Sequence, residues 1–137
     1  MKYRTAISAL IALLCGTAPA TTVGGITLPP SQDGLELSGA GLLRKGFFFK
    51  IYVGALYVAD PEHTENILGN VPKRIDIHYF HDTPKKYMVR TAEKTLRDNL
   101  TAEQYEGLLP KINRLHDAFR NGQKGSVASI LHKPGTG

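Results

Sequence analysis

The stretch of sequence that decides the fold is Gly39–Val58, which reads GAGLLRKGFFFKIYVGALYV. Glycines punctuate its start, and the later residues are mostly aromatic or β-branched, the composition of a β-strand. The adjacent cations Arg44 and Lys45, a further cation at Lys50, and the tyrosines Tyr52 and Tyr57 interrupt the apolar run. These groups suit a pocket for an apolar acid. They also suit a plain sheet with one solvated face, so the composition alone leaves both interpretations open.

Regular alternation along residues 47–58 predicts which side chains share a face of this strand. It places Ile51 with Val53 and Tyr57 on one side, and Lys50 with Tyr52 on the other. Both sides carry apolar groups, so we expect structural layers above and below the strand.

The first twenty residues have the pattern of a secretory signal peptide. Lys2 and Arg4 form a positive start, residues 6–14 are apolar, and the A-P-A at 18–20 is a small-residue cleavage site. The apolar run is shorter than the ~20 residues that a membrane-spanning helix needs. We therefore expect cleavage after Ala20, a periplasmic or secreted protein, no transmembrane segment in the mature chain, and a single domain over residues 21–137.

The remaining composition excludes several classes of protein. The only cysteine, Cys15, lies inside the predicted signal peptide, so the mature chain has neither a disulfide framework nor thiol chemistry. The modest excess of cations is scattered, which argues against a nucleic-acid partner. His78 and His81 are three residues apart and face opposite ways on a regular strand, so we expect no metal and no cofactor.

Patterning outside the central strand predicts an α+β domain with helices gathered against a largely antiparallel sheet. Residues 21–33 are rich in Gly, Pro and Thr and suggest an extended lead-in. Thr101 and Gln104 match a capping box that starts a helix. The expected strands are 35–37, with a bulge or turn at 38–41, then 47–58, 73–80 and 126–131; the expected helices are 60–68, 83–100 and 101–121.

The order of motifs resembles the chalcone isomerase fold family, and most closely its exported bacterial branch. The resemblance rests on the glycine turn at 39–41, on Arg44, on the FKIY and GALYV runs within 49–58, and on the later segments 73–87 and 124–137. It covers residues 35–137. It implies an open-faced sandwich, in which a large antiparallel sheet carries a layer of helices with a ligand cleft between them. The family's closing strands and last helix would lie beyond Gly137, so we expect a fragment or a shortened member.

The resemblance also implies a set of ligand-binding residues. The family arginine falls on Arg44, and Lys45 could share its role. The threonine of the true isomerases falls on Tyr52, and their helix tyrosine falls on Tyr87. The asparagine seven residues later falls on Lys94. The changes at Tyr52 and Lys94 depart from the catalytic pattern, so no catalytic residue is assigned.

Three functions are consistent with this sequence. The first is a non-catalytic exported protein that holds a small amphipathic acid, such as a fatty acid or a phenylpropanoid, with Arg44, Tyr52, Tyr87 and Lys94 as the ligand-binding residues. The second is an isomerase that closes a ring within its substrate, as in the plant members of the family. The third is a cell-envelope interaction module with a vestigial cleft.

Overall fold

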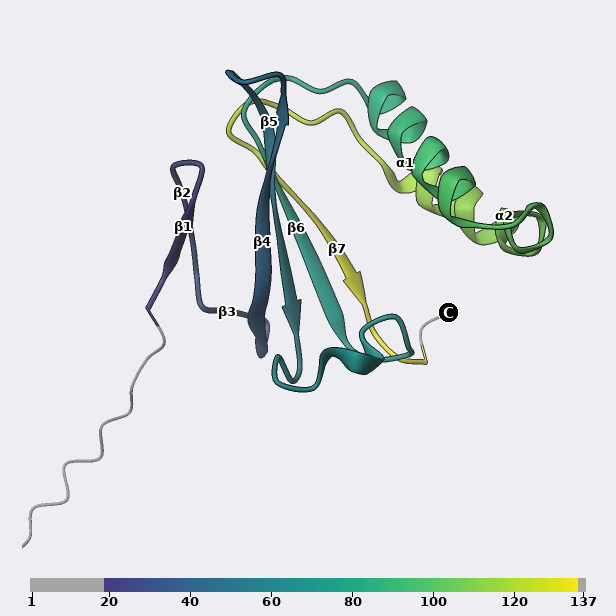
Figure 1. Ribbon diagram of the computed structural model, residues 1–137, viewed down its shortest axis with the longest axis horizontal. Coiled ribbons are helices and arrows are strands. Elements are labelled where there is room, and N and C mark those ends of the chain that lie inside the picture. Colours follow the sequence, from purple (N-terminus) through teal and green to yellow (C-terminus); the bar gives the residue numbers. More distant parts are fainter. Residues whose placement is uncertain (1–18, 136–137) are drawn as a thin grey trace, which may run out of the picture.

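A computed structural model describes residues 19–135 (Figure 1). These residues form β-strands and two α-helices. The described part of the chain forms a five-stranded antiparallel sheet in the order β3-β4-β5-β6-β7 and a separate two-stranded hairpin, β1-β2. The strands are β1 (Thr21–Val23), β2 (Ile26–Leu28), β3 (Ser31–Gln32), β4 (Leu35–Lys45), β5 (Phe49–Val58), β6 (Lys73–Tyr79) and β7 (Val127–His132). The expected α+β class is confirmed.

Two bulges shape the long ribbon formed by β4 and β5. The pairing register of β4 and β5 shifts by one residue between Leu37 and Gly39, so Ser38 is an extra residue on β4. A second shift, between Leu43 and Arg44, restores the register, and there the extra residue is Ile51 on β5. Each bulge bends the ribbon and turns the next side chains to the other face. The predicted break at 38–41 is therefore a bulge inside one continuous strand.

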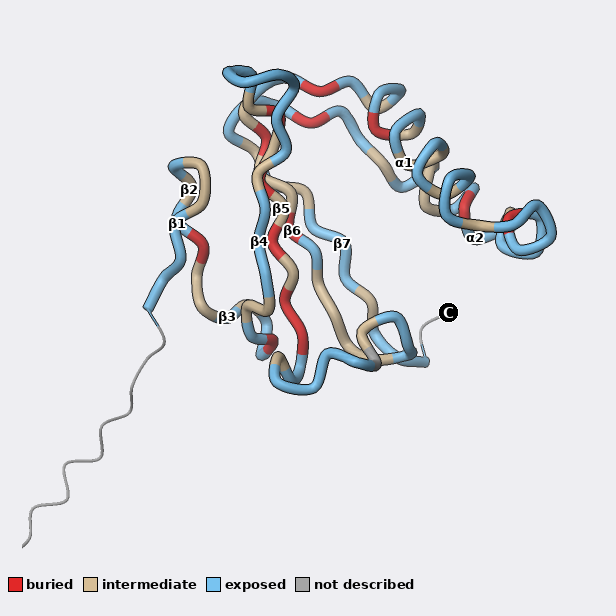
Figure 2. The backbone as a smooth tube through the Cα atoms, viewed as in Figure 1, coloured by how far each residue is buried: buried red, intermediate tan, exposed pale blue. Residues whose placement is uncertain are grey.

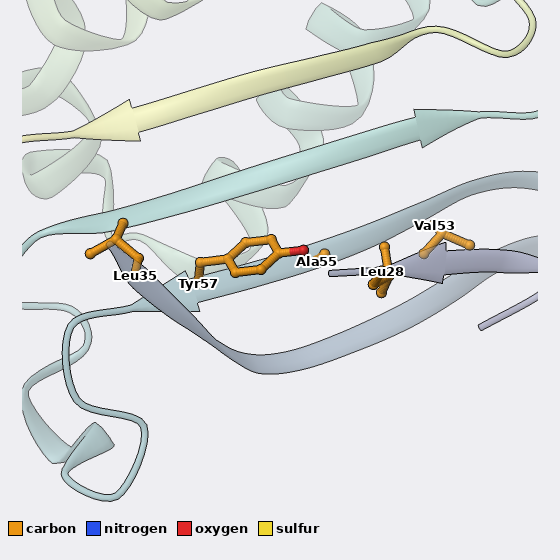
Figure 3. Packing of buried hydrophobic residues seen from close by; sticks show 5 residues of the cluster. All are labelled: Leu28, Leu35, Val53, Ala55 and Tyr57. Carbon is orange, nitrogen blue, oxygen red and sulfur yellow. The ribbon is translucent and has the colours of Figure 1, made fainter. Parts of the chain in front are cut away.

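One face of the sheet packs beneath the β1-β2 hairpin. Val53, Ala55 and Tyr57 of β5 form a buried cluster with Leu28 of β2 and Leu35 of β4 (Figure 3). The hydroxyl of Tyr57 donates to the carbonyl of Pro29 at 3.2 Å, which ties the hairpin's exit to the sheet. We call this the hairpin-facing side of the sheet. Figure 2 shows buried positions concentrated along β5.

The other face of the sheet is approached by α1 (Lys85–Asn99) and α2 (Ala102–Ala118), which leave its upper end in Figure 1. The predicted capping box is confirmed: Thr101 Oγ1 accepts from the Gln104 N–H, and the Gln104 side chain accepts from the Thr101 N–H. Pro110 is accommodated within α2. We call the face of the sheet that α1 and α2 approach the helix-facing side. Neither of these helices is long and apolar enough to cross a membrane.

Two of the elements expected from the sequence differ from the structure. The helix expected at 60–68 is a single 3₁₀ turn, Thr64–Asn66, preceded by a turn in which Asp60 Oδ1 accepts from the Glu62 N–H. Asp60 therefore closes a local turn instead of capping a helix. The lead-in at 21–33 is a hairpin, turned by Gly24 and Gly25 at positive φ, which covers the core. The predicted signal peptide lies almost wholly in residues 1–18, outside the described part.

Candidate ligand-binding cleft

The bulge at Ile51 reverses the faces expected for the middle of β5. Lys50 Nζ donates to the carbonyl of Gly24 at 3.0 Å, which places Lys50 on the hairpin-facing side. Ile51 lines a cavity beside α1 with Tyr87, on the helix-facing side. Tyr52 follows on that same side, since it lies close to Tyr87. The expectation that Lys50 and Tyr52 share a face is wrong, because regular alternation fails at a bulge.

Three tyrosines form a row on the helix-facing side. Tyr52 and Tyr79 are direct partners across β5 and β6, so their side chains share a face. Burial raises the pKa of Tyr52, and the neighbouring Tyr87 phenol raises it further. Burial likewise raises the pKa of Tyr79, with a smaller contribution from Tyr52. All of these shifts favour the protonated phenol, so the row offers hydroxyl groups that donate hydrogen bonds.

A cavity of about 310 Å³ with cations at its wall opens at one end of the tyrosine row. Lys45 of β4 and Lys86 of α1 line it together with Tyr87. Its floor is aromatic and aliphatic: Phe49 stacks on His81 with ring centroids 4.3 Å apart, and Ile51 lies beside them. The lining includes one carboxylate, Asp82, which accepts from the Lys124 N–H. Two ammonium groups and a phenol beside an apolar floor would therefore still suit an anionic head group.

A second cavity, of about 410 Å³, opens at the other end of the row, between β6, β7 and the end of α2. Its size falls within the ~300–1,000 Å³ typical of small-molecule pockets. Large apolar side chains dominate its walls, including Ile77, Leu115, Phe119 and Ile130. Ile130 is 36% exposed. The cavity is therefore an apolar surface that a ligand tail could cover.

A compact set of contacts holds both helices at this end of the sheet. Thr83 and Gly122 exchange two backbone hydrogen bonds of 2.8 Å, which join the entry of α1 to the exit of α2. Asn121 Oδ1 accepts from the Lys85 N–H at 2.8 Å and so caps the start of α1. Arg120 donates to three carbonyls at the end of α2. These contacts fix the angle at which the helices approach the sheet.

The residues predicted from the sequence separate into two groups. Tyr52 and Tyr87 come together at the cleft. Arg44 pairs with Lys50 in the ladder, which assigns it to the hairpin-facing side, and its Nη1 donates to the carbonyl of Phe47 at 3.1 Å. Lys94 is 75% exposed and pairs with Asp98 one turn along α1. Of the two adjacent cations on β4, Lys45 is the one that lines the cavity.

The hairpin-facing side holds a charged network of its own. Asp76 is 2% exposed, and its Oδ1 accepts from Arg74 Nε at 2.7 Å and from Ser129 Oγ at 2.6 Å. Arg74 also pairs with Asp33 at the end of β3. Residues of β6 and β7, together with Asp33 in the turn between β3 and β4, thus form one set of ion pairs and hydrogen bonds. Its partners satisfy one another, so we assign this network to holding the sheet together.

The two histidines of the His-x-x-His pattern point to different surroundings. His78 pairs with Val53 and Val127 in the ladder, and so lies on the hairpin-facing side. His81 stacks on Phe49 at the cation-lined cavity. Within residues 19–135, no group of three His, Cys, Asp or Glu side chains is placed to hold a metal ion.

A family model described as chalcone isomerase-like matches residues 20–137 of the sequence. The chain belongs to this chalcone isomerase-like family. The solved structure of a fatty-acid binding protein from Arabidopsis thaliana is similar to it, with a TM-score of 0.65 and 12% sequence identity. The match covers 85% of this chain and 74% of that one. At that identity the likeness concerns the fold, and it confirms the predicted open-faced sandwich. No curated protein matches the sequence.

Sequence reasoning missed two features of this chalcone isomerase-like cleft. The sequence pattern assigns Tyr79 only to a half-buried strand, yet it belongs to the tyrosine row beside Tyr52, at the end next to the apolar cavity. The Val23-Gly24-Gly25-Ile26 run carried a hairpin signal, a Gly-Gly pair between apolar residues, that would have predicted β1-β2. Nothing in the sequence marked Ile51 as a bulge.

Proposed function

We propose that this protein binds a small amphipathic acid, of the fatty-acid class, between the helix-facing side of the sheet and the two helices, without transforming it. The observation that carries the proposal is the order of chemistry along the cleft. Cations lie at one end, phenols in the middle and an apolar cavity at the other end. That order matches a molecule with a carboxylate head and a hydrocarbon tail.

The head group would bind at the cavity lined by Lys45 and Lys86. Each hydrogen bond to a charged group contributes about 1.5–3 kcal/mol when it is shielded from water. Tyr87 is 42% exposed, so contacts at this mouth lie toward the lower end of that range. Tyr52, next to Tyr87, would donate to a carboxylate oxygen from the inner side of this mouth. The ligand class named for the similar Arabidopsis protein supports this choice.

The tail would lie along the apolar cavity near Phe119 and Ile130. Burial of apolar surface contributes about 25 cal/mol per Å², so most of the affinity would come from this part. The half-exposed apolar groups that face the helices, Ile75 and Ile130, are direct partners on β6 and β7. A bound tail would remove them from water.

Tyr52 argues for binding over ring closure. It stands where the resemblance places the threonine of the true isomerases, and its burial keeps the phenol protonated. A protonated phenol can hold an oxygen atom of a ligand, but it is a poor base at neutral pH. The predicted signal peptide adds the proposal that binding takes place outside the cytoplasm.

The test is a titration that compares three ligands of matched size. A long-chain fatty acid, the alcohol with the same chain, and a chalcone are each added to the protein, and binding is followed by calorimetry. The proposal expects the acid to bind about tenfold or more tightly than the alcohol, and the chalcone to remain unchanged over hours. Equal affinity for the acid and the alcohol would show that the cations do not contribute to binding. Ring closure of the chalcone would show that the protein is an enzyme.

A further inference from the structure

The turn between β4 and β5 exposes two large aromatic side chains to water. Phe47 is 87% exposed and Phe48 is 96% exposed, with their ring centroids 6.5 Å apart. Phe49, the next residue, behaves differently because it stacks on His81. Exposed aromatic pairs of this kind mark a contact surface, since burying each ring would remove about 150–250 Å² from water.

This turn projects beyond the rest of the sheet. The ladder between β5 and β6 ends at the pair formed by Tyr52 and Tyr79. In the described chain, Phe49 and Lys50 continue the ladder with β4 alone. Gly46, at φ 65°, closes the turn in a backbone conformation that suits glycine. The aromatic pair therefore sits at the tip of a two-stranded ribbon, which forms the upper end of the molecule in Figure 1.

Positive charge surrounds the aromatic tip. Arg44 and Lys45 directly precede the turn and are exposed, and the sequence from 37 to 59 contains no Asp or Glu. The hydrogen bond from Arg44 Nη1 to the carbonyl of Phe47 holds the guanidinium beside the rings. Lys86 lines the neighbouring cavity, and Asp82 is the acidic residue in that lining. The Asp82 carboxylate accepts a hydrogen bond from the Lys124 N–H. Cations outnumber acids at this end.

The size and chemistry of the tip fit a membrane surface better than a folded protein partner. Two phenylalanine side chains bury about 300–500 Å², whereas a stable protein interface buries about 800 Å² on each side. A bilayer interface accepts exposed aromatic rings at head-group depth and attracts the cations beside them. We propose that the β4–β5 turn docks on an anionic lipid bilayer, with Phe47 and Phe48 inserted among the head groups and Arg44 against lipid phosphates.

Docking in this orientation places the cation-lined cavity at the lipid surface, because Lys45 and Phe49 belong both to the ribbon and to the cavity wall. An amphipathic acid could then pass between bilayer and cleft with its head group near water. This consequence rests on the proposed function, whereas the docking itself does not.

Single tryptophans test the docking locally, since the chain contains no Trp of its own. Phe48→Trp places the probe at the tip. Leu68→Trp is the matched control, because Leu68 is also 96% exposed and lies in the β5–β6 connection at the opposite end of the sheet (Figure 1). Both full-length variants are mixed with vesicles of phosphatidylcholine alone and of phosphatidylcholine with phosphatidylglycerol. The wavelength of tryptophan fluorescence emission is recorded, and so is the quenching of that fluorescence by brominated lipid.

The proposal expects a blue shift and quenching for Phe48→Trp with the anionic vesicles, and neither change for Leu68→Trp. An unchanged Phe48→Trp spectrum would overturn it, as would equal shifts at both positions or equal shifts with neutral vesicles. Capture of the tip by a protein partner, with no response to vesicles, would also overturn it.

Two further variants separate the aromatic and ionic contributions. In the Phe48→Trp background, Phe47→Ala should weaken vesicle binding by about tenfold, and Arg44→Gln by about fivefold. Arg114→Gln, an equal loss of charge on exposed α2, should leave it unchanged. Fatty-acid affinity measured without vesicles should survive Phe47→Ala. If the unsubstituted protein binds no fatty acid, the proposed function is refuted, whereas the docking proposal is judged only by the vesicle experiments.

Discussion

The ring of Tyr79 lies directly against the backbone of Gly122, at the point where the chain returns from α2 to the sheet. A β-carbon at position 122 would come within 2.7 Å of Tyr79 Cζ and 2.8 Å of two neighbouring ring carbons. Real β-carbons essentially never approach this closely, so any larger residue at position 122 would force the buried Tyr79 ring or the backbone to shift. The contact fixes the position of the Tyr79 ring, at the end of the tyrosine row next to the apolar cavity, and it also fixes the position of the chain where it leaves α2.

Gly122→Ala should therefore destabilise the protein. We expect a loss of about 1–3 kcal/mol in the free energy of unfolding, the cost of overpacking a well-packed site, measured by urea denaturation. Gly107→Ala is the matched control, because Gly107 lies within α2 and a β-carbon there would meet nothing within 4 Å. Alanine at this helical position should raise the free energy of unfolding by about 0.5–1 kcal/mol. Equal effects at the two glycines would refute the packing argument.

Tyr52 and Tyr57, on opposite faces of β5, should respond to loss of the hydroxyl in opposite ways. Tyr52→Phe removes a donor from the cleft, so fatty-acid affinity should fall while the free energy of unfolding stays constant. Tyr57→Phe removes the hydrogen bond to Pro29 in the core, and should cost about 1 kcal/mol of stability with unchanged affinity. Calorimetry and urea denaturation on both variants make the comparison. A loss of affinity in Tyr57→Phe alone would place the ligand under the hairpin.

Lys45 and Arg44, adjacent in the sequence, should differ as head-group anchors. Lys45 lines the cavity, so Lys45→Gln should weaken fatty-acid binding by about tenfold. Arg44 is directed to the carbonyl of Phe47, so Arg44→Gln should leave vesicle-free affinity unchanged. Titration of both variants with the same acid decides between them. The reverse result would restore the sequence-based assignment of Arg44 as the anchor.

The contact between the two helices should depend on pH through Glu93. Its carboxylate accepts from the Tyr105 hydroxyl at 2.6 Å and from Arg97 Nε at 2.8 Å. The hydrogen bond from Tyr105, with help from Arg97, lowers the pKa of Glu93 below its ordinary value of 4.5. A lowered pKa stabilises the folded state above pH 4.5, and this stabilisation is lost as the pH falls through the folded-state pKa.

Glu93→Gln should thus be less stable than the parent at pH 7, and the difference should shrink at about pH 3.5. Urea denaturation at both pH values measures it. Glu106→Gln removes an exposed carboxylate from the same helix pair and serves as the control. A difference between Glu93→Gln and the parent that is independent of pH would show that the carboxylate's charge is not what joins α1 to α2.

The parts of the fold that follow from local patterns were predictable, and those that depend on tertiary pairing were not. The capping box at Thr101 and the strand at 73–80 needed only nearby residues, and both are present within a residue or two of their expected bounds. The bulge at Ile51 depends on how β5 meets β4, and regular alternation cannot reveal it. That one residue decides which cation and which tyrosine face the cleft.

The resemblance supplied the family and the choice of Tyr52 and Tyr87, which the structure brings together. It could not show that Lys94 pairs with Asp98 on the outer surface of α1, because spacing along a helix fixes the side of the helix but not its neighbours. Gly122 had no local signal either. Its role exists only because Tyr79, distant in the sequence, lies against it.

The central claim is that an amphipathic acid lies between sheet and helices with its tail toward the end of α2. A fatty acid that carries a photoreactive diazirine near the end of its tail tests this most directly. After irradiation and digestion, mass spectrometry should find the adducts on the walls of the apolar cavity, in the segments that contain Ile77, Phe119 and Ile130. Adducts confined to the hairpin-facing side, or no adduct that excess unlabelled acid displaces, would contradict the account.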